Sequence, residues 1–307
     1  MKKNTRKIIV GLLFIVTICG VLVGYSAYKI AKFVSHTKFN STKKREFEEA
    51  RSLLCSECHA QPVILQTSDN ITLAGLWIKR ESAKYTFLLC HGFRTSKDKW
   101  LEFVRCFPHD NILAIDLRAH GESNGKIVSF GWHEVKDIST AVTWIKEQKH
   151  TQKTKIIGVG SSMGSAALLL AAQKGILLDG IIALSPFAAF DKLLEFNFTK
   201  VTRLPKFPLL KLQRWLLKRK LGVDISHIAP INEIDKLSIP LFIIHANHDP
   251  LTPVSHAQDL DRQTKSAHEL WIIEGTQHGR ELISHNIPEF KKRVSHWLKK
   301  CALDTTF

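Results

Sequence analysis

Short hydrophobic runs recur along the chain and alternate with longer segments of mixed polarity. Several runs are apolar throughout, as strands covered on both faces must be. Segments of helical length lie between them, among them Val135–Gln148 and Ser165–Lys174. Strands that alternate with helices predict an α/β domain with a mostly parallel sheet. The predicted strands are Ile71–Ile78, Phe87–Cys90, Ile112–Ile115, Lys155–Val159, Gly180–Leu184, Leu241–His245 and Leu270–Ile273.

One hydrophobic run is much longer than the others. No charged residue occurs over the 21 residues from Ile8 to Tyr28. As a helix this run is about 30 Å long, the thickness of a bilayer core. A cleaved signal peptide has a shorter apolar region of about 7–15 residues. The cleavage-like Gly24-Tyr25-Ser26 and the lipoprotein-type box ending at Cys19 are both poor matches. We therefore predict an uncleaved single-pass N-terminal membrane anchor within residues 1–28, followed by a charged connector over residues 29–61.

The net charge of +16, from 44 Lys+Arg and 28 Asp+Glu, suggests nucleic-acid binding until the charges are located. Residues 1–45 carry ten basic residues and no acid, and residues 186–226 carry nine basic residues and three acids. The rest of the chain is neutral. Basicity is therefore confined to the anchor and one internal segment, which favours a membrane surface and argues against nucleic acid. Basic flanks on both sides of the anchor, an odd number of cysteines outside it and sequons at Asn40, Asn70 and Asn197 leave the side of the membrane open.

The string Gly160-Ser161-Ser162-Met163-Gly164 carries the main chemical signal. It joins a predicted strand to a predicted helix, and a reversal this tight requires residues without side chains at both glycine positions. The central residue is then exposed at a helix N-terminus, where backbone N–H groups point outward. We predict Ser162 as a nucleophile and treat Ser161 as a neighbour.

A serine nucleophile needs a base and a carboxylate that orients the base. Asp249 follows the strand that ends at His245, and His278 follows the strand that ends at Ile273. The order Ser162, Asp249, His278 predicts a catalytic triad, with His278 as the base. Weaker candidates for the base are His248, His245 and His285.

The tetrahedral intermediate of acyl transfer needs two N–H donors. One is expected from Met163, which follows the nucleophile. The other is expected from Phe93, since His91-Gly92-Phe93 follows the strand Phe87–Cys90 and Gly92 lets the backbone approach a substrate.

These motifs, together with the string Asp116-Leu117-Arg118-Ala119-His120-Gly121-Glu122-Ser123, resemble the α/β-hydrolase superfamily over about residues 62–300. The string and Gly131-Trp132-His133-Glu134 are similar to the branch of monoglyceride lipases, proline iminopeptidases and Bem46-like membrane hydrolases. The resemblance implies an α/β-hydrolase fold with a small helical lid, here about residues 186–226, and hydrolysis through an acyl-enzyme. It implies no cofactor and no metal, and it fixes no substrate. Residues 301–307 are expected as a tail.

The segment expected as the lid contains a helix opened by Pro208 and running to Leu221. Lys211, Arg214 and Lys218 cluster on one side of this helix. Either the helix packs inward with solvated lysines, or its basic side lies on an anionic membrane and admits a lipid-derived ester. The other side of the helix is a broad apolar arc made of Leu209, Leu210, Leu212, Trp215, Leu216, Leu217 and Leu221.

The connector contains the string Cys55-Ser56-Glu57-Cys58-His59, which can mark covalent haem attachment. A string of five residues is a weak signal, and no second Cys/His pair of matching spacing follows for zinc. We expect instead a disulfide or two free thiols. We also expect a helix around Glu46–Leu54.

The sequence predicts a membrane-anchored serine hydrolase for a carboxylic ester. Its expected partners are a small-molecule ester and membrane lipids, the latter through the anchor and the basic lid. The alternatives are a thioesterase or aminopeptidase that uses the same triad, and a catalytically silent scaffold that keeps the fold. Acyl-chain length, leaving group and oligomeric state have no signature in the sequence.

Overall fold

The structure, a computed structural model, describes residues 41–202 and 206–303 together with ten isolated positions between 7 and 32. The anchor predicted from Ile8 to Tyr28 lies for the most part outside the described residues. Of the helices that are described, none is both long enough and apolar enough to cross a bilayer.

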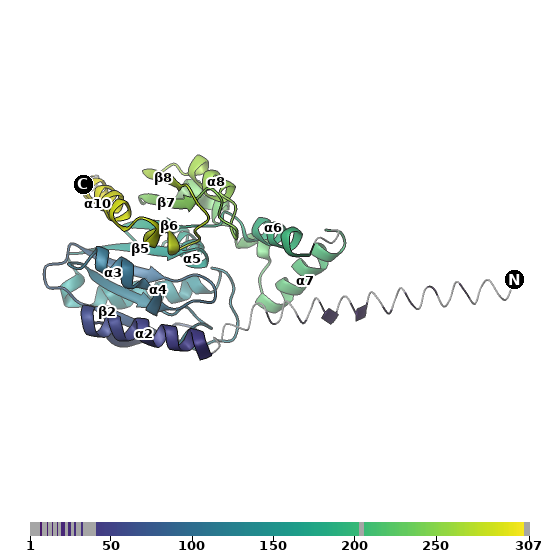
Figure 1. Ribbon diagram of the computed structural model, residues 1–307, viewed down its shortest axis with the longest axis horizontal. Coiled ribbons are helices and arrows are strands. Elements are labelled where there is room, and N and C mark those ends of the chain that lie inside the picture. Colours follow the sequence, from purple (N-terminus) through teal and green to yellow (C-terminus); the bar gives the residue numbers. More distant parts are fainter. Residues whose placement is uncertain are drawn as a thin grey trace.

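A sheet of eight strands forms the centre of the molecule, in the order β1-β2-β4-β3-β5-β6-β7-β8 (Figure 1). β2 runs antiparallel to both β1 and β4, and the strands from β4 to β8 pair in parallel. The seven predicted strands are all present, and β1 is an additional strand. The strands are β1 (Gln61–Gln66), β2 (Thr72–Ile78), β3 (Tyr85–Cys90), β4 (Asn111–Ile115), β5 (Lys155–Ser161), β6 (Gly180–Leu184), β7 (Leu241–Ala246) and β8 (His268–Ile273).

Helices cover both faces of the sheet, and each face has its own hydrophobic cluster. α4, α5 and α8 pack on one face, and α2, α3, α9 and α10 pack on the other. The α-helices are α2 (Ser41–Cys58), α3 (Leu101–Cys106), α4 (Glu134–Glu147), α5 (Met163–Gln173), α6 (Phe190–Thr202), α7 (Leu209–Leu221), α8 (Ser255–Gln263), α9 (Glu281–His285) and α10 (Ile287–Leu303). The short 3₁₀ helices are η1 (Lys97–Trp100), η2 (Lys149–Thr151), η3 (Ile225–His227) and η4 (Pro230–Lys236).

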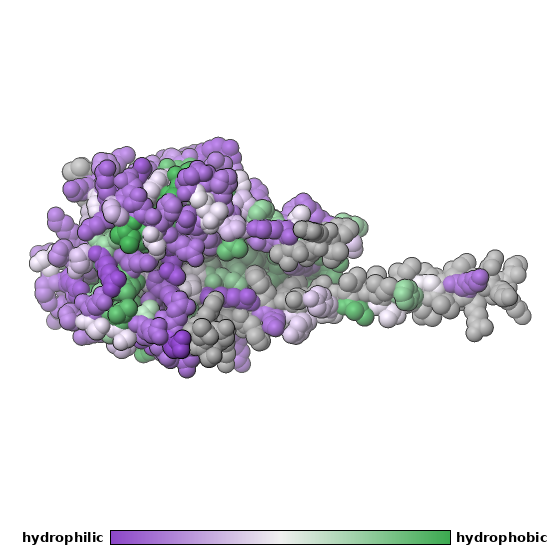
Figure 2. Space-filling model, in the orientation of Figure 1, coloured by the Kyte–Doolittle hydropathy of each residue, from purple (hydrophilic) through white to green (hydrophobic). Residues whose placement is uncertain are grey.

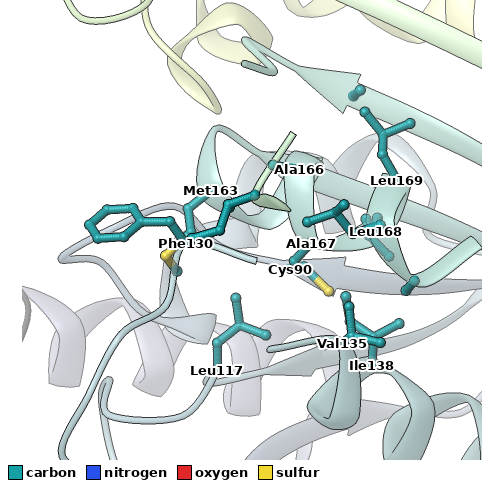
Figure 3. Close-up of a cluster of buried hydrophobic side chains, with 14 of the residues drawn as sticks. Cys90, Leu117, Phe130, Val135, Ile138, Met163, Ala166, Ala167, Leu168 and Leu169 are labelled. Carbon is teal, nitrogen blue, oxygen red and sulfur yellow. The ribbon is translucent and has the colours of Figure 1, made fainter. Parts of the chain in front are cut away.

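α5 is the most deeply buried helix of the site, because it is apolar on nearly every side. Ala166 and Ala167 bring it close to the sheet, and Figure 3 shows their cluster with Cys90 of β3 and with Val135 and Ile138 of α4. Small side chains allow this close approach. The packing fixes where α5 begins, and the residue before that first turn is Ser162.

Residues between β6 and β7 form a helical segment, in which α6 and α7 project from one end of the molecule (Figure 1). The apolar face of α7 that packs inward is narrower than the predicted arc. Only Leu210, Leu217 and Leu221 of that arc are buried, at spacings of 7 and 4 residues. Trp215, which belongs to the predicted arc, is instead 52% exposed.

The helix expected in the connector extends over Ser41–Cys58 as α2, and it packs on the sheet. Its residues Leu54 and Cys58 are buried in the hydrophobic cluster of that face. The Arg51 guanidinium donates hydrogen bonds to Asp98 at 3.0 Å and to Glu122 at 2.7 Å. α2 is therefore a structural part of the α/β domain.

Candidate active site

Ser162 occupies a strained turn between β5 and α5, with φ 51° and ψ −109°. Two glycines make this turn sterically possible. A Cβ on Gly160 would lie 2.4 Å from the Ser165 nitrogen, and a Cβ on Gly164 would lie 2.1 Å from the Cys90 carbonyl oxygen. Both separations are far below van der Waals contact. The glycine requirement predicted from the sequence therefore has a direct geometric cause, and strain of this kind is typical of functional residues.

Asp249 and His278 meet at the carboxyl ends of β7 and β8. His278 Nδ1 lies 2.7 Å from Asp249 Oδ2. The other carboxylate oxygen, Oδ1, accepts the N–H groups of Leu251 at 2.8 Å and Thr252 at 2.9 Å. Burial alone raises the pKa of the Asp249 carboxyl, but the bonds from His278 and from the backbone outweigh it and leave the pKa below its ordinary value. The carboxylate is therefore charged and holds the proton of the imidazole on Nδ1.

Ser162 and His278 line the same pocket, which has a volume of about 510 Å³. Among the described residues no hydrogen bond joins the Ser162 hydroxyl to His278. Much of the pocket wall is apolar, and this part consists of Phe47, Phe93, Phe130, Met163, Phe187, Phe190, Leu193, Leu194 and Leu251. Charged side chains also line the pocket, namely Glu46, Arg94, Lys99, Arg280 and Glu281.

The loop after β3 places Phe93 beside Ser162, since Gly92 packs against Ser161 and Ser162. The buried His91 orients this loop. Its Nε2 accepts the Leu117 N–H at 3.0 Å, so the ring proton must be on Nδ1, which donates to the Gly92 carbonyl at 2.7 Å. A trans peptide places its N–H opposite its carbonyl. By holding the Gly92 carbonyl, His91 fixes the direction of the Phe93 N–H.

Comparison with known proteins identifies the family. Residues 85–225 match the family profile described as alpha/beta hydrolase fold, and the architecture superposes on solved hydrolases of this fold. The chain belongs to the α/β-hydrolase superfamily. This α/β hydrolase is 29% identical over 240 residues to the uncharacterized protein YqkD of Bacillus subtilis, which covers 76% of this chain and 78% of that protein.

Two solved structures illustrate the range of the likeness. The esterase Pf2001 of Pyrococcus furiosus superposes with a TM-score of 0.66 at 25% identity, over 80% of this chain and 93% of that one. A membrane phospholipase A described as a bacterial virulence factor superposes with a TM-score of 0.62 over 97% of this chain and 99% of that one. At 17% identity, the second likeness is one of fold.

Two serines that the sequence did not single out as functional hold the histidine loop of this α/β hydrolase. The Ser161 hydroxyl accepts the Arg280 N–H at 3.2 Å, and the Ser185 hydroxyl accepts the Gly279 N–H at 2.9 Å. Ser161, which the sequence marked only as a neighbour of Ser162, therefore connects the elbow to the loop that carries His278.

The three weaker candidates for the base do not line the pocket. His245 is buried behind the acid, with Nε2 2.9 Å from the Thr252 carbonyl and 3.6 Å from Asp249 Oδ2. The His248 side chain is 68% exposed beside Glu274. His285 is exposed at the end of α9. Of the four candidates, only His278 lies in the pocket and is paired with the acid.

The string around Asp116 is structural in this α/β hydrolase. The Asp116 carboxylate is fully buried and accepts bonds from the Lys97 N–H and ammonium, each at 2.8 Å, and from the Glu122 N–H at 2.9 Å. Arg118 likewise binds Asp137 at 2.9 Å. These networks fix the loops behind the pocket. The narrower branch to which the string was assigned stays a prediction.

α2 contributes to the pocket as well as to the core. Glu46 and Phe47, near its start, line the pocket together with Lys99 of η1. The Lys99 ammonium pairs with Glu46 and lies 5.1 Å from the centre of the Phe47 ring. Further along α2, Cys55 and Cys58 are free thiols, the second of the two outcomes expected for them.

Proposed function

We propose that this α/β hydrolase is a membrane-anchored serine hydrolase that cleaves a carboxylic ester through a covalent acyl-enzyme. Ser162 is the nucleophile, His278 the general base and Asp249 the group that orients the base. The N–H groups of Phe93 and Met163 stabilise the oxyanion. The proposal requires no cofactor.

The chemistry divides into two half-reactions. Ser162 Oγ attacks the ester carbonyl carbon while its proton passes to His278 Nε2, and the negative charge that develops on the carbonyl oxygen is bound by the two N–H groups. The C–O bond to the alcohol breaks as Nε2 returns the proton to the leaving oxygen. Water then attacks the acyl-enzyme by the same route and releases the carboxylic acid and free Ser162.

The observation that carries this proposal is the 2.7 Å contact between His278 Nδ1 and Asp249 Oδ2, in a pocket shared with Ser162. Asp249 Oδ2 accepts the hydrogen bond from Nδ1, so the neutral tautomer of His278 presents Nε2 as the acceptor for the serine proton. A surface histidine would need no such buried partner. The likeness to the Pyrococcus furiosus esterase Pf2001, at 25% identity, supports ester hydrolysis.

The pocket lining favours an apolar acyl group over a free amine. Its five phenylalanines and three leucines present hydrocarbon to the substrate. An aminopeptidase needs net negative charge to bind the substrate amine. The cations Arg94, Lys99 and Arg280 outnumber the acids Glu46 and Glu281, so these side chains give the pocket no net negative charge. A thioester would fit the same lining, and the leaving group distinguishes the two.

The membrane anchor is also part of the proposal and rests on the uncharged run from Ile8 to Tyr28. Its test is membrane fractionation of the full chain. Retention in the pellet after an alkaline carbonate wash supports an integral anchor, and complete release contradicts it.

Hydrolysis of p-nitrophenyl esters of increasing chain length tests the activity. We expect turnover by the wild type and a loss of at least 10³-fold in Ser162→Ala, which removes the nucleophile. Ser226→Ala, which changes an exposed serine of η3, is the matched control and should behave as wild type. Equal turnover by Ser162→Ala and wild type would exclude Ser162 as the nucleophile. A folded wild type without turnover on any ester or thioester would favour the scaffold.

A further inference from the structure

The exposed side of α7 carries an aromatic residue among cations. Lys211, Lys218 and Arg219 lie four residues before, three after and four after Trp215, so the four side chains share one helix face. Trp215 is 52% exposed, and the Arg219 guanidinium lies 5.0 Å from the centre of its ring. Phe207, just before the helix, is 77% exposed. We call these five residues the α7 stripe.

The stripe differs from the rest of α7 in how its charges are neutralised. Arg214, predicted from the sequence to cluster with Lys211 and Lys218, instead lies on the inward side, near Asp191 and Glu195 of α6. Within the stripe, Lys218 pairs with Asp224 at 3.0 Å, but Lys211 is exposed and pairs with no acid of the described chain. The stripe therefore has a net positive charge around two large exposed apolar rings. Soluble surfaces seldom combine these features, whereas helices at the bilayer interface commonly do.

The stripe lies at the same end of the molecule as the pocket. α6, which packs on α7, contributes Phe190, Leu193, Leu194 and Asn197 to the pocket wall. Figure 1 shows the start of α2 directed toward the end at which α6 and α7 project, and Figure 2 shows apolar surface in the recess where these helices meet the body. A surface that contacts α7 at the stripe would therefore lie next to α6, the helix that forms part of the pocket wall.

The chain that leads to α2 limits how far this end can be from a bilayer. Twelve residues, 29–40, separate the predicted anchor from Ser41. Even fully extended, they span about 40 Å. The anchor therefore keeps the start of α2, and with it the pocket, within one domain diameter of the membrane.

We propose that the α7 stripe lies on the anionic bilayer that holds the anchor, and that the pocket takes its ester from that bilayer. Trp215 and Phe207 enter the interface, and Lys211, Lys218 and Arg219 meet the lipid phosphates. The substrate class is then the ester of a membrane lipid. This inference rests on the proposed hydrolase activity and anchor, and it adds the surface and the source of the substrate.

Depth-dependent quenching of tryptophan tests the stripe in the full chain. The protein is reconstituted in nanodiscs of phosphatidylcholine with phosphatidylglycerol, with and without bromine on the acyl chains, and compared with Trp215→Phe. Trp271→Phe is the matched control, since Trp271 is a partly exposed tryptophan on the edge strand β8 and also carries a guanidinium, Arg293, at 4.7 Å. We expect bromolipid to quench the tryptophan fluorescence of wild type and of Trp271→Phe to the same extent. The quenched part of the fluorescence should be absent in Trp215→Phe.

Equal quenching in all three proteins, or no quenching in any of them, overturns the proposal that the stripe lies on the bilayer. A stripe that binds another protein instead of the bilayer would give this result. Quenching that persists unchanged in pure phosphatidylcholine, or in Lys211→Glu, overturns the proposal that the stripe requires anionic lipid. Turnover of 4-methylumbelliferyl oleate dissolved in the nanodisc should fall several-fold in the double variant Trp215→Phe, Lys211→Glu, and equal turnover contradicts uptake from the bilayer. Turnover of soluble p-nitrophenyl acetate on the same samples reports the hydrolase activity separately.

Discussion

Replacing Asp249 by Asn tests the orientation of the catalytic base. The two oxygens of the carboxylate have different partners: Oδ1 accepts two backbone N–H groups at 2.8 and 2.9 Å, and Oδ2 faces His278 Nδ1 at 2.7 Å. An amide has only one oxygen. If its NH₂ group replaced Oδ1, two backbone donors would lose their acceptor, at a cost of about 1–3 kcal/mol each.

The amide of the Asp249→Asn variant should therefore keep its oxygen toward the backbone and turn its NH₂ toward His278. Nδ1 must then act as an acceptor, so the ring proton moves to Nε2, which can no longer take the proton of Ser162. A wrong tautomer of this kind lowers kcat by about 10⁴-fold, or about 5.5 kcal/mol of transition-state stabilisation. KM should change little, because Asp249 does not line the pocket.

The assay is the full kinetic analysis of p-nitrophenyl ester hydrolysis, with thermal unfolding to show that the variant is folded. Asp235→Asn, which changes an exposed acid that pairs with Lys265 at 3.4 Å, is the matched control and should keep wild-type kcat. A folded Asp249→Asn enzyme with kcat within tenfold of wild type would refute the assignment of Asp249 as the orienting acid.

Gly164→Ala should destabilise the fold or abolish turnover, because its Cβ would lie 2.1 Å from the Cys90 carbonyl oxygen; wild-type activity and melting temperature would contradict the geometry of the elbow. Arg51→Met should lower the free energy of unfolding by about 2 kcal/mol and raise KM, because it breaks the bonds to the two carboxylates that hold α2 beside the pocket. Urea unfolding measures the first effect and steady-state kinetics the second. An unchanged KM would argue against α2 as a wall of the pocket. Burial lowers the pKa of His91 to about 4 and of His120 to about 3, so both stay neutral in the folded state while they take up protons in the unfolded chain below pH 6.5. The stability that these two imidazoles contribute is therefore complete above pH 6.5 and falls by about 1.4 kcal/mol per pH unit for each group between pH 6.5 and 4. Urea unfolding of wild type and His120→Gln at pH 7 and 5 isolates the contribution of His120, and the same pH dependence in both proteins would contradict it.

The strands were predictable because most of them are buried on both faces. β6 and β7, for example, are apolar at nearly every position and are completely buried. β1 was not predicted, and its burial explains why. It is an edge strand with polar residues at both ends and Pro62 inside, and only Leu65 is buried. Nothing in its sequence distinguishes it from a loop, and only its pairing with β2 defines it.

The elbow and the members of the predicted triad were visible in the sequence because each follows a strand end in a recognisable local string. The two serines that support the histidine loop were not visible in the sequence in this way. Ser161 bonds to a residue 119 positions away, and Ser185 bonds to one 94 positions away. Serines that make such long-range bonds have no local signature. Their function follows only from the arrangement of β5, β6 and β8 in one sheet.

The contribution of α2 was hidden for a different reason. Its many charges indicated a solvated connector, and several of them are indeed exposed. Arg51, however, has its partners about 50 and 70 positions later, on the loops that follow β3 and β4. A sequence read one segment at a time cannot match these charges.

The role of Ser162 as the nucleophile is tested by the site at which a fluorophosphonate modifies the protein. This reagent reacts with a serine only where a base and an oxyanion hole activate it. We expect a stoichiometric adduct that tandem mass spectrometry locates on Ser162, the absence of this adduct in Ser162→Ala, and slow or no labelling in Asp249→Asn. An adduct on Ser161 or another serine, or equal labelling of wild type and Ser162→Ala, would contradict it.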